Sequence, residues 1–344
     1  MISEHGGNSL GLDILYDFSA NLNPLGMPER VKNALKNSVG EWEKYPDHSC
    51  EKLIGKISEA LSFEADRIVC GNGAADIIYR IVRSVKPQKC VITAPAFSEY
   101  EKALREIGCE IEYISLSEKN DFRLEASCLE LLESGADMLI LCSPNNPTGQ
   151  IIQTELLKKI CEKCYNNNIV FLCDECFLEL TENGDAFSAV NFLNGKTVVL
   201  KAFTKTYAMA GLRLGYALFG DQSLAKAVRE NGQFWSVSAP AQIAGIAALD
   251  EKKYLSESRK IIKAEREFLS KSLSDFGIRV FDSAANFLLL RSDIPLYDAL
   301  LREKILIRSC ANFRGLDERY FRVAVRTHEE NLALIAAVGR IIHG

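Results

Sequence analysis

Short, nearly continuous apolar runs alternate with amphipathic segments between about residues 66 and 203. Such runs are typical of strands buried on both faces, and the segments between them carry apolar residues at helical spacing. Strands alternating with helices in this way predict a mostly parallel sheet covered by helices, an α/β fold. The expected strands are 66–73, 89–97, 109–116, 137–144, 169–177 and 196–203, and the expected helices are 74–85, 98–108, 123–134 and 154–168.

The pattern changes after residue 221. Residues 222–275 are helical in pattern, and shorter strand-like pieces follow at 278–283, 286–292, 305–310 and 320–326, before a final helical segment at 329–344. This change predicts a second, smaller α+β domain. We expect an N-terminal segment (1–40) that joins the small domain, a large domain (41–245), and a linking helix with the small domain (246–344).

Composition excludes several classes of protein. The chain has 344 residues, is 47% hydrophobic and 25% charged, and carries a net charge of −5, without a Lys/Arg block that would indicate nucleic-acid binding. No apolar run approaches the roughly 18 residues that a membrane span requires. Residues 1–13 do not have the pattern of a secretory signal. The 11 cysteines therefore indicate reduced thiols in the cytoplasm rather than a disulfide framework.

Polar and glycine-containing motifs follow four of the expected strands. "CGNGAAD" (70–76) places glycines before a helix, where free backbone amides suit a phosphate. "SPNNPTG" (143–149) offers paired amides, and "CDEC" (173–176) ends a buried strand with two carboxylates, which are costly there unless paired. "TKTYAMAGLRLG" (204–215) surrounds a lysine with threonines and an arginine. Ligands of such sheets bind beyond the carboxyl ends of the strands, so we expect these motifs to share one ligand.

One cofactor suits this set of groups. Pyridoxal 5'-phosphate (PLP) has a phosphate, a phenolic oxygen, a ring nitrogen that must stay protonated, and an aldehyde that a lysine captures. With these motifs the chain resembles the fold type I PLP-dependent enzymes over almost its whole length: a large domain with a mostly parallel sheet between helices, plus a smaller α+β domain.

The resemblance implies a role for individual residues. Lys205 would capture the aldehyde, Asp174 would pair with the ring nitrogen, and Asn146 would donate to the phenolic oxygen. Phe97 would stack on the ring, and Tyr45 would reach the cofactor phosphate of a neighbouring subunit, which implies a homodimer. The phosphate would be held by Thr204, Arg213 and the amides near Gly73, Ala74 and Ala75.

Two C-x-x-C pairs, Cys161 with Cys164 and Cys173 with Cys176, offer an alternative of another class, a zinc-binding interaction module. The first pair shares a helix face, but residues three apart on a strand point to opposite sides. We therefore expect core cysteines and no metal.

Motifs near both ends of the chain indicate which reaction of this family to expect. "HGGN" (5–8), "DFSANLNPLGMP" (17–28) and residues 305–326 are similar to the threonine-phosphate decarboxylase group of the family, which is close to the histidinol-phosphate aminotransferases. This similarity implies a lyase of cobalamin biosynthesis that converts L-threonine O-3-phosphate to (R)-1-amino-2-propanol O-2-phosphate. Arg322 would bind the substrate carboxylate, and Arg308, His5 and Asn21 would surround its phosphate.

The residues themselves add support. Five arginines crowd residues 308–326, and guanidinium groups bind carboxylate and phosphate bidentately. Phe177 stands where many aminotransferases of the family carry a tyrosine, and Ala202 stands where relatives often carry an extra phosphate donor. A histidinol-phosphate aminotransferase, or another phospho-amino-acid aminotransferase, is the alternative within the cofactor class.

Overall fold

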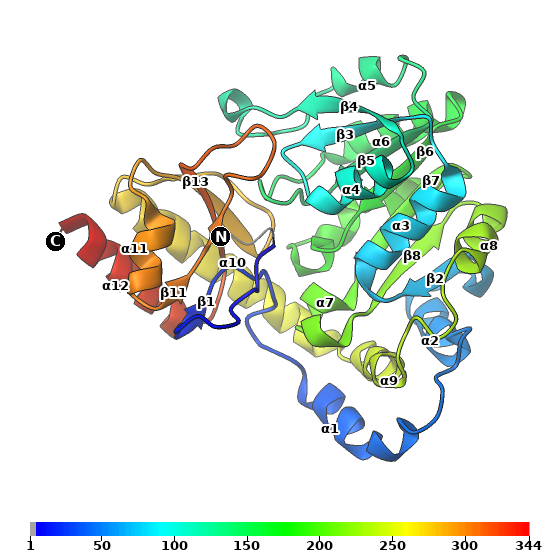
Figure 1. The fold of residues 1–344 in the computed structure, drawn as a ribbon, viewed down its shortest axis with the longest axis horizontal. Helices are drawn as coiled ribbons and strands as arrows, with labels where there is room; N and C mark the ends of the chain where they lie inside the picture. Colours follow the sequence, from blue (N-terminus) through cyan, green and yellow to red (C-terminus); the bar gives the residue numbers. More distant parts are fainter. Residues whose placement is uncertain (1–4, 344) are drawn as a thin grey trace.

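A seven-stranded sheet forms the centre of the computed structural model, which describes residues 5–343 (Figure 1). Neighbouring strands in the order β4-β3-β5-β6-β7 are parallel, as the sequence predicts, whereas β8 runs antiparallel to both β7 and β2. The sequence prediction missed β8, because its short apolar run directly follows a glycine-rich loop. The strands are β2 (Ile68–Gly71), β3 (Lys89–Ala94), β4 (Glu110–Ser115), β5 (Met138–Cys142), β6 (Val170–Asp174), β7 (Thr197–Ala202) and β8 (Gly215–Phe219).

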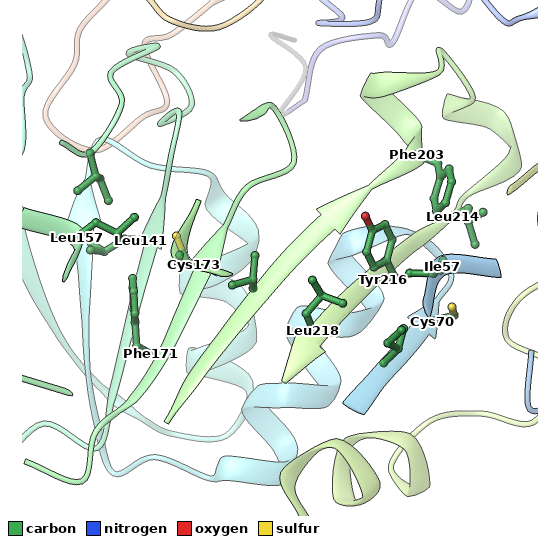
Figure 2. Packing of buried hydrophobic residues seen from close by; sticks show 14 of the residues in the cluster. Ile57, Cys70, Leu141, Leu157, Phe171, Cys173, Phe203, Leu214, Tyr216 and Leu218 are labelled. Atoms are coloured by element: carbon green, nitrogen blue, oxygen red, sulfur yellow. The ribbon is translucent and has the colours of Figure 1, made fainter. Parts of the chain in front are cut away.

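Helices cover both faces of this sheet. Successive side chains of a strand point to opposite faces, so Leu172 packs into one core cluster while Phe171 and Cys173 pack into the other. Figure 2 shows part of the second cluster, where Tyr216 and Leu218 of β8 lie near Ile57. One face is covered by α3 (Gly73–Val85), α4 (Ser98–Glu106) and α8 (Gln222–Glu230), and the other by α2 (Glu51–Leu61), α6 (Thr154–Asn166) and α9 (Ala239–Ala248).

A second sheet lies in the C-terminal part of the chain. It has four antiparallel strands in the order β12 (Arg308–Ser309), β13 (Tyr320–Ala324), β10 (Phe287–Arg291) and β9 (Arg279–Val280). Beside it, β1 (Tyr16–Asp17) pairs in parallel with β11 (Ile305–Leu306), which brings the N-terminal segment to this region (Figure 1). The helices of this part are α10 (Lys252–Asp275), α11 (Leu296–Arg302) and α12 (His328–His343). Further along the N-terminal segment, α1 (Glu29–Asn37) packs against α9. The division into domains stays a prediction.

One helical prediction differs from the structure. Residues 123–134 form only the single turn α5 (Cys128–Leu131), flanked by tight backbone turns, although Cys128 and Leu132 are buried in the core. Residues 222–275 are mostly helical, as the sequence predicts, and they form the three helices α8, α9 and α10; Ser238 caps α9, and Pro240 lies in its first turn. In the part of the chain that the structure describes, no helix is both long and apolar enough to cross a membrane.

Candidate active site

A cavity of about 1000 Å³ opens at the carboxyl ends of the parallel strands, where these face the C-terminal sheet. The ends of β3, β6 and β7 line it through Ala94, Asp174 and Ala202. Of the 14 residues predicted for the site, 12 line this cavity: His5, Asn21, Ala74, Ala75, Phe97, Asn146, Asp174, Thr204, Lys205, Arg213, Arg308 and Arg322. Four motifs far apart in the sequence are therefore brought together.

Lys205 lies in α7 (Phe203–Thr206), the turn directly after β7. Burial, together with the positive charges of Arg322 and Arg213, lowers the pKa of its amine to about 8. The N-terminal segment holds this turn, since Asn23 donates its backbone N–H to the carbonyl of Lys205 over 3.1 Å and its side-chain amide to the carbonyl of Thr206 over 2.9 Å. The lysine is thus rigidly placed and easily deprotonated.

Asp174 is the last residue of β6 and is 5% exposed. Burial raises the pKa of its carboxyl group, whereas hydrogen bonds from Cys176 and Tyr100 favour the ionised form. The Tyr100 hydroxyl donates to Oδ2 over 2.5 Å, and the Cys176 backbone N–H donates to Oδ1 over 2.9 Å. Both oxygens are therefore fixed in place. Tyr100 was not predicted from the sequence, although it follows Phe97 by only three residues and the two rings are in contact, with centres 5.7 Å apart.

The backbone around Gly73 and the guanidinium of Arg213 form a cradle at the start of α3. A Cβ on Gly73, whose φ is +81°, would lie 2.5 Å from Arg213 Nη2. A Cβ on Gly215 would lie 2.7 Å from the backbone nitrogen of Ala74. Free amides at a helix start, next to a guanidinium, suit a phosphate group. Thr204 is buried beside them, and Ala202 lines the cavity with a methyl group and no donor.

Arg322, on β13, connects the C-terminal sheet with the motif after β5. Its Nη1 donates to Asn146 Oδ1, and its Nη2 donates to the Ser19 carbonyl over 2.8 Å. The first bond orients the Asn146 amide, so that the nitrogen is its donor end, as the predicted role requires. Burial lowers the pKa of Arg322 to about 10, and the nearby charge of Arg308 contributes in the same direction.

The residues that we predict to surround the substrate phosphate lie at different depths in the cavity. Arg308 is 4% exposed and donates to Asn312 Oδ1 over 2.7 Å, while its guanidinium lies 5.3 Å from the centre of the Phe313 ring. Asn21 is 2% exposed, and its Oδ1 accepts no hydrogen bond from the described residues. His5 lies at the mouth, with Nε2 2.9 Å from a carboxylate oxygen of Glu99.

The five arginines of residues 308–326 separate in the structure. Arg308 and Arg322 are buried in the cavity, and Arg314 lines its mouth. By contrast, Arg319 pairs with Asp317, and Arg326 pairs with Glu330. Sequence clustering alone could not distinguish these groups.

Tyr45 lies outside this cavity. Its side chain is 79% exposed and stacks on Trp235, with ring centres 4.3 Å apart. Within one chain, Tyr45 does not reach the cavity. Its predicted contact with the cofactor phosphate of a neighbouring subunit stays a prediction.

The four cysteines of the C-x-x-C pairs are core residues. Cys161, Cys164 and Cys173 belong to one core cluster, and Cys176 belongs to the cluster on the other face of the sheet. Among residues 5–343, no group of three or more His, Cys, Asp or Glu side chains could hold a metal ion. These cysteines do not form the zinc site of the alternative hypothesis.

Known proteins resemble this chain along almost its full length. The family model of class I and II aminotransferases matches residues 13–338. The threonine-phosphate decarboxylase of Salmonella typhimurium is 38% identical, across 99% of this chain and 97% of that protein. The adenosylcobalamin biosynthesis bifunctional protein CobDQ of Leptospira interrogans is 31% identical over 100% of this chain, which corresponds to 41% of that longer protein. A solved structure, the histidinol-phosphate aminotransferase from Clostridium acetobutylicum, has a TM-score of 0.89 at 30% identity and covers 95% of this chain and 99% of its own.

The cavity fits the cofactor of these proteins. A phosphate cradle at Gly73 and Arg213, an oriented amide at Asn146, a doubly hydrogen-bonded carboxylate at Asp174 and a buried amine at Lys205 match the groups of PLP. The predicted fold type I architecture is also confirmed by the solved relative. The chain belongs to the class I and II aminotransferase family of PLP-dependent enzymes.

Proposed function

We propose that this protein is a lyase of cobalamin biosynthesis that decarboxylates L-threonine O-3-phosphate to (R)-1-amino-2-propanol O-2-phosphate, with PLP as its cofactor. One observation carries the proposal: two buried guanidinium groups, Arg308 and Arg322, face the cavity that holds Lys205. Guanidinium groups bind carboxylate and phosphate with paired N–H donors, so these two arginines suit a substrate that has both groups. The identity to the Salmonella threonine-phosphate decarboxylase agrees with this assignment.

Bound PLP supplies a ring that accepts the electrons of a bond broken at the substrate Cα. Around it we assign the phosphate to Arg213, Thr204 and the amides at Gly73, Ala74 and Ala75, the ring face to Phe97, and the phenolic oxygen to Asn146. Asp174, ionised with the help of two hydrogen bonds, balances the charge of the ring nitrogen. Lys205 accepts or delivers a proton near neutral pH, because its pKa is about 8.

The two buried arginines indicate where the carboxylate and the phosphate of the substrate bind. Arg322 is next to Asn146 and binds the carboxylate, whereas Arg308 binds the phosphate, with Asn21 and His5 nearby. Guanidinium groups bind both anions with paired N–H donors, and burial strengthens these bonds. Phe177 lines this side of the cavity with an apolar ring that packs against the buried Phe287, with ring centres 5.1 Å apart, and it contributes no hydroxyl donor.

We also propose a homodimer, in which Tyr45 reaches the cofactor phosphate of the partner subunit. The support is an exposed aromatic surface formed by Tyr45, Trp235 and Phe234, whose rings contact one another and whose relative exposures are 79%, 46% and 70%. Soluble monomers rarely expose such a group of rings. Sedimentation equilibrium measures the association directly, and a monomer at micromolar concentration contradicts it. We place the enzyme in the cytoplasm, since its 11 cysteines are all free thiols.

Incubation of the PLP-loaded protein with L-threonine O-3-phosphate tests the reaction, with CO₂ and keto acid measured together. Release of CO₂ without keto acid supports the decarboxylase. Keto acid without CO₂ makes the protein an aminotransferase, the activity named for the Clostridium relative.

Two arginine variants test the substrate class. Arg322→Ala should weaken the binding of phosphorylated and unphosphorylated amino acids alike, because both kinds of substrate have the carboxylate. Arg308→Ala should remove the preference for L-threonine O-3-phosphate over L-threonine, by tens- to about a thousand-fold in relative kcat/KM, since a charge-assisted bond to a desolvated anion is lost. Arg319→Ala is a matched control, because that arginine pairs with Asp317. Equal losses on both substrates in Arg308→Ala would show that Arg308 does not bind the phosphate.

A further inference from the structure

Residues 311–316, the mouth loop, connect β12 with β13 and line the cavity. The loop contacts Arg308, since Asn312 Oδ1 accepts a hydrogen bond from its guanidinium over 2.7 Å and the Phe313 ring lies 5.3 Å from it. Two of the loop's side chains therefore support the arginine to which we assign the substrate phosphate.

The next residue of the loop, Arg314, contacts the opposite side of the cavity. Its guanidinium lies 4.3 Å from the centre of the Tyr113 ring and pairs with Glu101 over 3.2 Å. Tyr113 belongs to β4 and Glu101 to α4, both on the side of the seven-stranded sheet. Arg314 thus connects the C-terminal sheet to the large sheet across the mouth of the cavity.

Arg105 provides an internal comparison. It pairs with the same carboxylate, Glu101, over 2.7 Å, but both residues belong to one helix, four positions apart. Its ion pair therefore connects nothing across the mouth. Arg105 and Arg314 are also similarly exposed, with side-chain exposures of 61% and 51%. They differ chiefly in whether the ion pair crosses the mouth.

We propose that Arg314 is a positioning residue for recognition of the substrate phosphate. Through its contacts with Glu101 and Tyr113, Arg314 holds the mouth loop in place. Asn312 and Phe313 then stay in contact with Arg308, and the Arg308 guanidinium keeps one orientation. This inference rests on the proposed function, because it takes the phosphate to be the ligand of Arg308. It adds a second arginine that acts on the substrate through the loop and not by contact.

The expected effect lies in KM. An exposed ion pair and a cation–π contact together stabilise modestly, so Arg314→Ala should raise KM for L-threonine O-3-phosphate on the order of 3- to 30-fold. Because kcat depends on Lys205 and Asp174 at the other end of the cavity, it should stay within about twofold. KM for unphosphorylated L-threonine should be unchanged. Arg314→Lys keeps the charge and should recover part of the loss.

Two comparisons separate this role from a general loss of structure. Arg105→Ala should leave both kinetic constants unchanged. In a background of Arg308→Ala, the Arg314→Ala change should have no further effect, because its target is already absent. Chymotryptic cleavage after Phe313, measured without substrate, should be faster in Arg314→Ala than in Arg105→Ala, since the mouth loop has lost its attachment.

The outcomes distinguish the inference from the function on which it rests. If Arg308→Ala loses the phosphate preference while Arg314→Ala keeps the KM of the unmutated enzyme, the positioning role is wrong and the proposed function stands. Losses that add fully in the double variant, or equal effects of Arg105→Ala and Arg314→Ala, also overturn the positioning role. If Arg308→Ala keeps the preference, both proposals fail.

Discussion

Replacement of Tyr100 by phenylalanine removes a single hydrogen bond of the candidate active site, the one that Tyr100 donates to Asp174. The Tyr100 hydroxyl donates to Asp174 Oδ2 over 2.5 Å, and the two residues are 1% and 5% exposed. Phenylalanine keeps the ring and its edge contact with Phe97, whose centre lies 5.7 Å away. The Tyr100→Phe variant should therefore fold normally and lose only the O–H group that favours an ionised Asp174.

The magnitude follows from the kind of bond that is lost. A buried hydrogen bond to a charged group contributes about 1.5–3 kcal/mol, and one pKa unit corresponds to about 1.4 kcal/mol. The pKa of Asp174, which burial already raises, should therefore rise further in this variant. If the whole bond is required in the transition state, kcat/KM should fall roughly 10- to 150-fold.

The pH profile of kcat/KM tests this reasoning. Asp174 acts as a carboxylate, so a higher pKa moves the acid limb of the profile to higher pH, and the loss should be largest on the acid side. Tyr79→Phe is a matched control, because the Tyr79 hydroxyl donates to Glu99 over 3.1 Å in a more exposed setting. A profile identical to that of the unmutated enzyme, or an equal loss in a background of Asp174→Asn, would refute the assignment.

Three further predictions concern the cofactor residues. Lys205→Ala should abolish turnover and the absorbance band of lysine-bound cofactor while circular dichroism stays unchanged, and a variant that keeps the band contradicts the central assignment. Because only a neutral amine captures the aldehyde, the rate of PLP capture by the cofactor-free protein should rise with pH through a midpoint near 8, the pKa of Lys205, and a midpoint above 10 is inconsistent with it. Gly73→Ala should weaken PLP binding at least tenfold, because its Cβ would lie 2.5 Å from Arg213 Nη2 at a φ of +81°; Gly211→Ala, with no atom within 4 Å of the added Cβ, should bind normally.

The fold and the cofactor site could be predicted because they depend on local pattern. Parallel strands end at one edge of a sheet, so motifs that follow different strands converge there, and Asp174 and Lys205 meet for that reason. Gly73 was predictable since a tight turn at a helix start favours glycine. Strand β8 was missed, because its antiparallel position next to β2 is decided by a distant partner and not by its own five residues.

The pairs of side chains that contact each other across the cavity could not be predicted from the sequence. Tyr100 hydrogen-bonds Asp174, 74 residues away, and the Arg322 guanidinium reaches the Ser19 carbonyl, 303 residues away. Nothing in the spacing of the arginines indicates that Arg308 and Arg322 are buried while Arg319 and Arg326 pair with neighbouring carboxylates. Arg308 and Arg322 are opposite each other on the paired strands β12 and β13, whereas Arg319 and Arg326 lie outside these strands, and only the folded chain defines this pairing.

The charges inside the cavity constrain its ligand. Two guanidinium groups are buried in one cavity. Burial lowers the pKa of Arg322, and the nearby charge of Arg308 contributes in the same direction. Burying a charged group is costly unless it is paired and hydrogen-bonded, so the anionic groups of a ligand that reach these arginines are bound favourably. We assign Arg213 to the cofactor phosphate, and Arg308 and Arg322 to the substrate. An amino acid with one carboxylate can bind one of these two guanidinium groups, whereas a phosphorylated amino acid can bind both, and this is the physical reason to favour L-threonine O-3-phosphate over L-threonine.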